Sequence, residues 1–340
     1  MSRFLNNSAS TSEGALDVQM NVVIPTYRRP KLLARALDSV RNQAFTGFEC
    51  IIVNDSPCDR VVLDELLTSF GDSRFRLLHN ETNMGGNYCR NRGIRESSAP
   101  IIAFLDDDDE WGSEKLAKHY QVHSSCRSPV VVYSGYTLRW IEGARPDQVR
   151  LAENAPTDVP GEMILGRFCP ATTSSVTVDR QCFSDVGVFD ELLPSLQDWD
   201  MWFRISRKFE FVAISECLNV FHQHAGDRAS INWEKRMRAL DLIEEKYNSD
   251  TSVDFGDLRR KITDSAFISN VVNYAGANEY WNGLSFIFTN RKRLLGDVGC
   301  RPILTACLRL FSPQFLVDIQ RTFRDKLTKK ELHKKRGTRA

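Results

Sequence analysis

The sequence predicts a Rossmann-like α/β protein with a mostly parallel central sheet and helices on both faces. Over roughly the first third of the chain, short β-branched apolar runs alternate with amphipathic helical segments, which is the pattern of βαβ units. One of these runs, Ile101–Leu105, leads directly into four consecutive aspartates. In an open sheet, ligands bind beyond the carboxyl ends of the parallel strands. We therefore expect the acidic run to lie at a ligand site.

Each predicted element rests on a hydrophobic pattern. Short apolar runs predict the strands, and apolar residues at helical spacing, such as Leu33, Leu37 and Val40, predict the helices. The predicted strands are 22–24, 50–53, 75–78, 101–105, 130–133, 173–178, 211–214 and 218–221. The predicted helices are 31–43, 61–70, one through 90–94, 113–123, one capped by Asp198, 233–247, 255–275 and 278–293, and an irregular loop is expected over about 142–161.

The bulk composition is that of an ordinary globular protein and excludes few classes. The net charge is +1, which gives no indication of nucleic-acid binding. The nine cysteines are scattered without a CxxC pair, as expected in a reducing compartment. Residues 1–17 lack the apolar core of a signal peptide, and no stretch approaches the ~20 apolar residues of a membrane-spanning helix. We expect a cytoplasmic protein.

The acidic run itself predicts a cation site. Mg²⁺ and similar hard divalent ions take oxygen ligands, and Mg²⁺ often uses only one or two carboxylates together with substrate phosphates. Most charge runs are solvated loops, and that interpretation applies here as well. The buried strand before Asp106 and the aromatic Trp111 after the run favour the metal site.

The turns after the first two strands have the composition of a nucleoside site. No GxGxxG motif follows the first strand, and no GxxxxGK[ST] motif occurs, so a dehydrogenase-type dinucleotide site is excluded. Tyr27 offers an aromatic ring for stacking, and Asp55 offers a carboxylate that can accept from a ring N–H. Proline, aspartate and serine also form turns for purely local reasons, which is the alternative explanation.

A glycine-bearing segment, Asn83–Asn87, precedes a helix that carries Arg90 and Arg92. Its glycines permit close approach of backbone to a ligand, and helix N-termini and arginines both favour phosphate. An ordinary loop followed by a basic surface helix would have the same composition.

Seven motifs together resemble the family 2 glycosyltransferases, which have the GT-A fold. The motifs are Val23–Pro30, Asn54–Ser56, Asn83–Gly86, Arg90–Ile94, Phe104–Trp111, Gly187–Asp190 and Asp198–Arg204. They cover about residues 20–230 in the family's order and near its spacing, which makes the set specific. The resemblance implies an inverting transferase that moves a sugar from a nucleotide-diphosphate donor, with a UDP-sugar as the expected donor.

The resemblance also implies the roles of individual residues. The implied donor-binding residues are Pro25, Thr26, Tyr27, Arg29, Asp55, Asn83, Gly86, Arg90, Arg92, Asp106 and Asp107. The implied ligands of Mn²⁺ or Mg²⁺ are Asp106, Asp108 and His224, with Asp106 and Asp108 forming the DxD motif. Asp198 matches the catalytic aspartate, which would act as the general base. The spacing of His224 by itself does not indicate a metal ligand.

Two residues depart from the family's pattern. Gln197 stands where members usually have the glutamate before the base, which can alter acceptor binding. Asn54 stands where many members have aspartate, but Asp55 remains available. Outside this resemblance, two alternatives stay open: a nucleotidyltransferase, which would usually show a glycine-rich phosphate loop after strand one, and a non-catalytic scaffold that binds sugar nucleotides.

The expected organisation has four parts. They are a flexible tail at 1–17, a catalytic domain at 18–230 with a nucleotide-binding half (18–110) and an acceptor half (111–230), a helical extension at 231–300 and an amphipathic basic segment at 301–340. An apolar stripe flanked by Lys and Arg suits binding to anionic lipid, and packing on the catalytic domain is the alternative. The expected acceptor is a glycan or lipid-linked molecule in surface polysaccharide synthesis, and a peripheral position on the inner face of the cytoplasmic membrane stays open.

Overall fold

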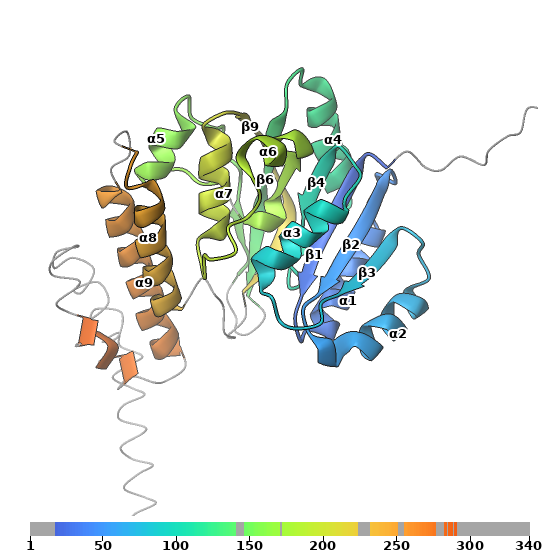
Figure 1. Ribbon diagram of the computed structural model, residues 1–340, viewed down its shortest axis with the longest axis horizontal. Coiled ribbons are helices and arrows are strands. Elements are labelled where there is room, and N and C mark those ends of the chain that lie inside the picture. Colours follow the sequence, from blue (N-terminus) through green and yellow to red (C-terminus); the bar gives the residue numbers. More distant parts are fainter. Residues whose placement is uncertain are drawn as a thin grey trace, which may run out of the picture. The chain divides into compact units, whose positions relative to one another are not determined.

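The computed structural model describes residues 18–140, 146–170, 172–223, 232–250 and 255–276, together with parts of 282–290 (Figure 1). The strands are β1 (Met20–Thr26), β2 (Phe48–Asn54), β3 (Phe75–His79), β4 (Ile101–Phe104), β5 (Glu110–Trp111), β6 (Val130–Trp140), β7 (Gln148–Arg150), β8 (Val176–Asp179) and β9 (Glu210–Gln223). The α-helices are α1 (Pro30–Arg41), α2 (Arg60–Phe70), α3 (Gly86–Glu96), α4 (Lys115–Ser125), α5 (Val159–Ile164), α6 (Arg180–Val186), α7 (Gln197–Ser206), α8 (Trp233–Tyr247) and α9 (Gly256–Gly276). Two short 3₁₀ helices, η1 (Pro57–Asp59) and η2 (Thr173–Ser175), complete the described elements.

The chain forms two compact units. Unit 1 comprises Met1–Ala155, Pro170–Phe189 and Arg204–Gln223, and it contains all the described strands. Unit 2 comprises Pro156–Cys169, Asp190–Phe203 and His224–Ala340. The predicted domain boundaries at 110, 230 and 300 stay predictions. Residues 301–340 and His224 lie outside the described part of the chain.

The sheet of unit 1 has the order β3-β2-β1-β4-β8-β6-β9-β5, with β7 paired to β6. The first four strands are all parallel, as the alternation of strands and helices predicts. Beyond β4 the pairing is mixed, because β8 runs antiparallel to both β4 and β6, whereas β6 and β9 are parallel. The fold predicted from the sequence, a sheet covered by helices on both faces, is confirmed.

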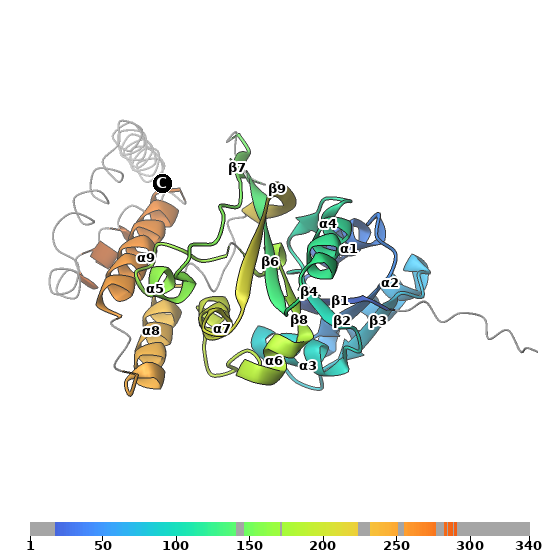
Figure 2. The same cartoon turned by 90° about the horizontal axis from the view of Figure 1, so that it is seen from above.

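Alternate residues of the parallel strands face different helix layers. Met20, Val22 and Ile24 of β1 pack into one core with apolar residues of α1, α2 and α4. On the other face, α3 lies so close to β1 that a Cβ at Gly93 would come within 2.2 Å of a γ-carbon of Val23. Figure 2 shows α1 and α4 on one side of β1–β4 and α3 and α6 on the other. Both faces of the sheet are therefore buried.

Unit 2 is held by aromatic contacts between α7, α8 and the start of α9. Trp199 and Phe203 stack with ring centroids 5.0 Å apart, and Phe203 meets Tyr247 edge to face. Asp200 is fully buried, accepts a hydrogen bond from the Tyr247 hydroxyl (2.8 Å) and forms an ion pair with Lys246 (2.9 Å). Asp200 thus fastens two helices together.

Several predicted elements differ from the structure. The predicted strand over 173–178 begins as the 3₁₀ turn η2, and only its second half is a strand. The two predicted strands between 211 and 221 are one continuous strand, β9, because a register shift opposite Gly135 accommodates the polar residues Ser215 and Glu216 without ending the ladder. The predicted loop over 142–161 contains β7 and the start of α5. β5 was not predicted, since its two residues have no pattern of their own.

Candidate functional site

The topology of unit 1 creates one place where parallel strands diverge. From β1 the chain moves outward to β2 and β3, and then crosses back through α3 to pair β4 with the other side of β1. Such a switch point opens a crevice at the carboxyl ends of the two strands, which is where open α/β sheets bind their ligands. Here β1 ends at Thr26 and is followed by Arg29, and the segment after β4 carries the acidic run, Asp106–Glu110.

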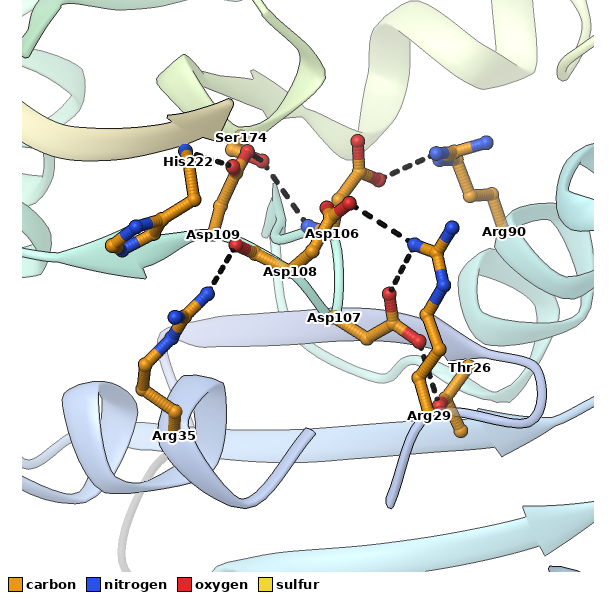
Figure 3. Close-up of polar contacts among 10 residues, drawn as sticks. All are labelled: Thr26, Arg29, Arg35, Arg90, Asp106, Asp107, Asp108, Asp109, Ser174 and His222. Carbon is orange, nitrogen blue, oxygen red and sulfur yellow. Dashed lines mark hydrogen bonds and ion pairs between the residues drawn. The ribbon is translucent and has the colours of Figure 1, made fainter. Parts of the chain in front are cut away.

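Thr26 and Arg29 face the acidic run directly (Figure 3). The Thr26 hydroxyl donates to Asp107 at 2.8 Å, and Arg29 Nη1 lies 3.0 Å from a carboxylate oxygen of Asp108 and 3.4 Å from Asp107. Arg28, between them, has a φ of 57°, a left-handed conformation that non-glycine residues rarely adopt. This tight turn after β1 brings the hydroxyl and the guanidinium to the same side, against the carboxylates.

Asp106 is held from α3. Its carboxylate pairs with Arg90 Nη2 at 2.5 Å, and its backbone N–H donates to the Ser174 hydroxyl at 3.1 Å. Arg90 is mostly buried, whereas the Asp106 side chain remains about one third exposed. Arg90, which was expected near a diphosphate, thus lies at the acidic run, and its role toward a diphosphate stays a prediction.

The far end of the run is tied to α1 and β9. Arg35 donates from Nη2 to the Asp108 carbonyl oxygen at 2.6 Å and lies 3.1 Å from Glu110. His222 hydrogen-bonds the Glu110 carboxylate through Nε2, and its backbone N–H donates to Asp109. Burial, and then the charge of Arg35, lowers the pKa of His222. This histidine therefore favours its neutral form.

Negative charge exceeds positive charge in this cluster. Among the described residues, the five carboxylates of Asp106 to Glu110 lie with the three guanidiniums of Arg29, Arg35 and Arg90, and the formal charges of these eight groups sum to −2. Burial, with a further contribution from Asp108, raises the pKa of Asp107 to about 6. Burial and the charges of Asp108 and Asp106 likewise raise the pKa of Asp109. The cluster therefore favours a ligand that brings positive charge.

The residues present fit a hard divalent cation that takes part of its coordination from a ligand. Asp106 and Asp108 supply partly exposed carboxylates, the donor type that Mg²⁺ and Mn²⁺ prefer. Within the described ranges, no group of three or more His, Cys, Asp or Glu side chains converges into a closed metal site. An all-protein cage is thus not present in the part of the chain that the structure describes, and the predicted third ligand, His224, lies outside it.

Asp55 organises the loop before α3. Its two oxygens accept hydrogen bonds from the Asn80 side-chain amide (2.7 Å), the Met84 N–H (2.8 Å) and the Gly85 N–H (2.8 Å). Arg92 supports the same loop, since its Nη1 donates to the His79 carbonyl oxygen at 2.7 Å and to Asn80 at 2.6 Å. Asp55 and Arg92 were both expected to bind the donor, but the hydrogen bonds observed here join them to other residues of the protein.

The remaining residues expected at the donor lie around the same edge. Tyr27 is exposed and in reach of solvent, whereas Pro25 is half-buried at the end of β1. Asn83 and Gly86 are exposed, and Gly86 is the first residue of α3, with Gly85 at a φ of 89° just before it. The loop therefore presents an accessible helix N-terminus, and the contacts of all these residues with a donor remain a prediction.

Asp198 belongs to unit 2 and lies in the first turn of α7. The expectation that it caps this helix is wrong, because α7 begins one residue earlier, at Gln197. Leu196, just before the helix, takes the left-handed φ of 59°. The Asp198 carboxylate accepts from the Trp199 N–H at 2.8 Å. Burial raises the pKa of the Cys169 thiol, with a further contribution from Asp198, and burial lowers the pKa of Arg236 against the opposing charge of Asp198. A carboxylate in that position is favoured by the helix dipole in its ionised form.

Three contributors were missed by the sequence prediction. Ser174, Arg35 and His222 all touch the acidic run, yet none lies in a motif with a recognisable spacing. Ser174 sits in a run of Thr and Ser that merely precedes a strand, and Arg35 looks like a polar position of an amphipathic helix. Only the pairing of β5 with β9 brings His222 to Glu110, so nothing local could have indicated it.

Two comparisons of sequence identify the family. The model of the family described as "Glycosyl transferase family 2" matches residues 21–156. A putative colanic acid biosynthesis glycosyl transferase of Escherichia coli K12, WcaA, is 34% identical over 221 residues, which are 61% of this chain and 74% of that protein. Other relatives are longer, and the chain spans 42% of a glycosyltransferase of Rickettsia bellii to which it is 24% identical.

Solved structures show the same fold. The mannosyltransferase PcManGT of Pyrobaculum calidifontis, in complex with GDP-Man and Mn²⁺, matches with a TM-score of 0.53 at 14% identity, over 86% of this chain and 87% of that one. S. aureus TarS 1–349, in complex with UDP-GlcNAc, matches with a TM-score of 0.51 at 16% identity, over 75% and 81%. The fold and site thus define a glycosyl-transferring enzyme of the GT-A class. The chain belongs to glycosyltransferase family 2.

Proposed function

We propose that this enzyme moves a sugar from a nucleoside diphosphate sugar to a hydroxyl group, with inversion at the anomeric carbon and with a divalent cation. The observation that carries the proposal is the acidic run at the β1/β4 switch point, faced by a hydroxyl and by arginines from two other elements. Support comes from the two structural neighbours, one bound to UDP-GlcNAc and the other to GDP-Man and Mn²⁺. A UDP-sugar is the donor to test first.

The donor would lie along the edge formed by the ends of β1, β2 and β4. Tyr27 offers an exposed ring on which a base can stack, and the Gly86 end of α3 offers backbone N–H groups with a favourable dipole for phosphate. Arg29 and Arg90 carry the positive charge that a diphosphate needs, and both already lie within ion-pair distance of the run. Asp55 and Arg92 would act indirectly, by holding the loop before α3.

Asp106 and Asp108 would hold the cation, Mn²⁺ or Mg²⁺, with Asp107 beside the donor and His224 as a further ligand. The bound cation would offset the negative charge that develops on the departing diphosphate. Asp106 and Asp108 suit this role because they are the less buried of the four aspartates, whereas Asp109 is buried and hydrogen-bonded to Ser174.

Asp198 would act as the general base. As the acceptor oxygen bonds to the anomeric carbon, its proton passes to the Asp198 carboxylate, and the bond from carbon to phosphate oxygen breaks with both electrons leaving on the diphosphate. One displacement by the acceptor inverts the configuration. Gln197, which precedes Asp198, would set the acceptor preference in place of the family's usual glutamate.

The acceptor would be a glycan or a lipid-linked intermediate of a surface polysaccharide. WcaA, to which the chain is 34% identical, carries the name of a colanic acid biosynthesis glycosyl transferase. Within the described residues, no helix is long and apolar enough to cross a membrane. Contact with a lipid surface would come from the basic, apolar sequence of 301–340.

A donor screen tests the proposal. Purified protein would be mixed with Mn²⁺ or Mg²⁺ and a panel of UDP-, GDP- and dTDP-sugars, and both slow donor hydrolysis and the shift in melting temperature would be recorded. We expect one nucleotide class to stabilise the protein and to be hydrolysed only when the cation is present. Folded protein that neither binds nor hydrolyses any donor would contradict the proposal.

Matched variants sharpen the screen. Asp108→Asn removes one proposed cation ligand and should abolish the donor hydrolysis that depends on the cation. Asp38→Asn, at an exposed position of α1, should behave as the wild type. Donor binding without hydrolysis or transfer in the wild type, unchanged by Asp198→Asn, would instead support the non-catalytic scaffold.

A further inference from the structure

The 3₁₀ turn η2 places one fully buried hydroxyl against the acidic run. Ser174 Oγ accepts the N–H of Asp106 at 3.1 Å and donates its only proton to the carboxylate of Asp109 at 2.5 Å. The Ser174 carbonyl oxygen accepts the indole N–H of Trp111 at 2.8 Å. Ser174 alone is thus hydrogen-bonded to three residues of the segment Asp106–Trp111, namely Asp106, Asp109 and Trp111.

These contacts divide the run into two sets of carboxylates. In Figure 3, Asp109 is directed to Ser174, while Asp106 and Asp108 are directed to Arg90 and Arg29. The turn itself is closed by a hydrogen bond from the Asp109 N–H to the Asp106 carbonyl oxygen at 3.1 Å. With both ends of this turn fixed on one oxygen atom, the main chain that carries Asp106 and Asp108 is tied to η2.

The turn η2 is anchored from the core of unit 1. The buried Lys115 donates from Nζ to the Ser175 carbonyl oxygen at 3.0 Å and contacts His119 at 3.1 Å. His119 is in turn hydrogen-bonded to Thr177 (2.9 Å), and Thr177 is hydrogen-bonded to His123 (2.8 Å). The main chain on which Ser174 stands is therefore itself held by buried hydrogen bonds.

We propose that Ser174 is a positioning residue for the cation ligands Asp106 and Asp108. It touches neither the donor nor the cation, and it acts by fixing the loop that carries both carboxylates. The inference rests on the proposed function, since it assigns the purpose of the contact to cation binding. Residues that orient metal ligands in this way typically change metal affinity by about 10- to 100-fold when they are substituted.

Two neighbouring serines give a matched pair for the test. Ser174→Ala removes the hydroxyl that binds Asp106 and Asp109. Ser175→Ala removes an equally buried hydroxyl whose partners are Asn219 (3.0 Å) and Thr172 (3.2 Å), away from the acidic run. The melting temperatures of both variants, measured without cation, show that both are folded and report the general cost of losing a buried hydroxyl.

The first measurement needs no cation. Hydrogen exchange of the peptide covering 105–111 should accelerate in Ser174→Ala, because the Asp106 N–H loses its acceptor, and should match the wild type in Ser175→Ala. The second measurement is Mn²⁺ affinity from the spin-resonance signal of free Mn²⁺, taken with Mn²⁺ alone and with UDP or GDP added. Ser174→Ala should bind Mn²⁺ about tenfold more weakly than wild type, and Ser175→Ala should bind it as wild type does.

The outcomes are distinct. Unchanged exchange in Ser174→Ala would show that the hydroxyl does not hold the loop and would overturn the inference. Faster exchange with unchanged Mn²⁺ affinity would show a purely structural contact and would also overturn it. A wild-type protein that binds no Mn²⁺ under any of these conditions would overturn the cation assignment in the proposed function, and with it the positioning role, whatever the exchange data show.

Discussion

Asp55 provides the sharpest test of whether a residue expected to bind the donor also stabilises the protein without one. The carboxylate accepts three hydrogen bonds, two on one oxygen from Asn80 and Met84 and one on the other from Gly85. In Asp55→Asn a single oxygen remains, so the new NH₂ group must face at least one of these donors. The variant should therefore be less stable even in the absence of any nucleotide.

The size of the effect follows from these contacts. A hydrogen bond to a charged group contributes about 1.5–3 kcal/mol, and a donor left unpaired in a buried site costs about 1–3 kcal/mol. Asparagine can keep the two bonds on one oxygen and lose the one from Gly85, so we expect the free energy of unfolding to fall by about 2–3 kcal/mol. At about 2–4 °C per kcal/mol for a unit of 150–250 residues, the melting temperature should fall by about 4–12 °C.

The assay is thermal and urea unfolding of the wild type and the variant without ligand, followed by nucleotide titration. Asp38→Asn is the control, because its carboxylate is exposed and makes one ion pair within α1, which contributes at most about 0.5 kcal/mol. If Asp55→Asn unfolds together with the wild type but no longer binds nucleotide, the loop-anchoring role is refuted and Asp55 is a direct ligand contact.

Three further predictions concern other parts of the molecule. Burial lowers the pKa of His119, so only the unfolded chain takes up its proton near the usual value of 6.5, and stability present above that pH is lost below it. Acidification from pH 7.5 to 5.5 should lower the free energy of unfolding by about 1 kcal/mol through this group, and urea unfolding of His119→Gln should show that much less acid sensitivity. Gly93→Ala should lower the free energy of unfolding by about 1–3 kcal/mol through its clash with Val23. Adding Val23→Ala should recover part of that loss, and a double variant whose loss equals the sum of the two single losses would contradict this explanation. Asp198→Asn should lower steady-state turnover by about 10²- to 10⁴-fold with donor binding retained, and intact turnover would show that another group is the base.

The parallel half of the fold could be read from the sequence because its signals are local. β1, β2 and β4 are mostly apolar runs buried on both faces, β3 is a partly buried strand at the end of the sheet order, and each intervening helix has its own amphipathic spacing. The carboxyl end of β4 was identifiable because an apolar run meets a carboxylate run there. The residues that follow each strand at its carboxyl end could therefore be identified from the local sequence, whereas the crossover that places β4 beside β1 could not.

The second half could not be read in the same way because its geometry depends on long-range pairing. β9 looks like two strands in the sequence, and only its ladder with β6 shows that the polar residues between them form an irregularity. Ser174 approaches the acidic run from η2, just before β8, and His222 approaches it from β9, and β8 and β9 lie on opposite sides of β6 in the sheet order. The partners of Asp55 at 80–85 likewise lie a whole αβ unit away, so its contacts within the protein could not be predicted, and its role toward a donor stays a prediction.

The ion pairs of Arg29 and Arg90 have a consequence for how the two proposed ligands of the site assemble. These guanidiniums serve as internal counter-ions to Asp108 and Asp106. A cation that binds the same carboxylates competes with them, and a diphosphate gives the displaced arginines another anion to bind. Each ligand thereby lowers the free-energy cost of binding the other, and by linkage the coupling is reciprocal. The donor site would thus respond to the product of two concentrations, filling cooperatively when cation and nucleotide are both abundant.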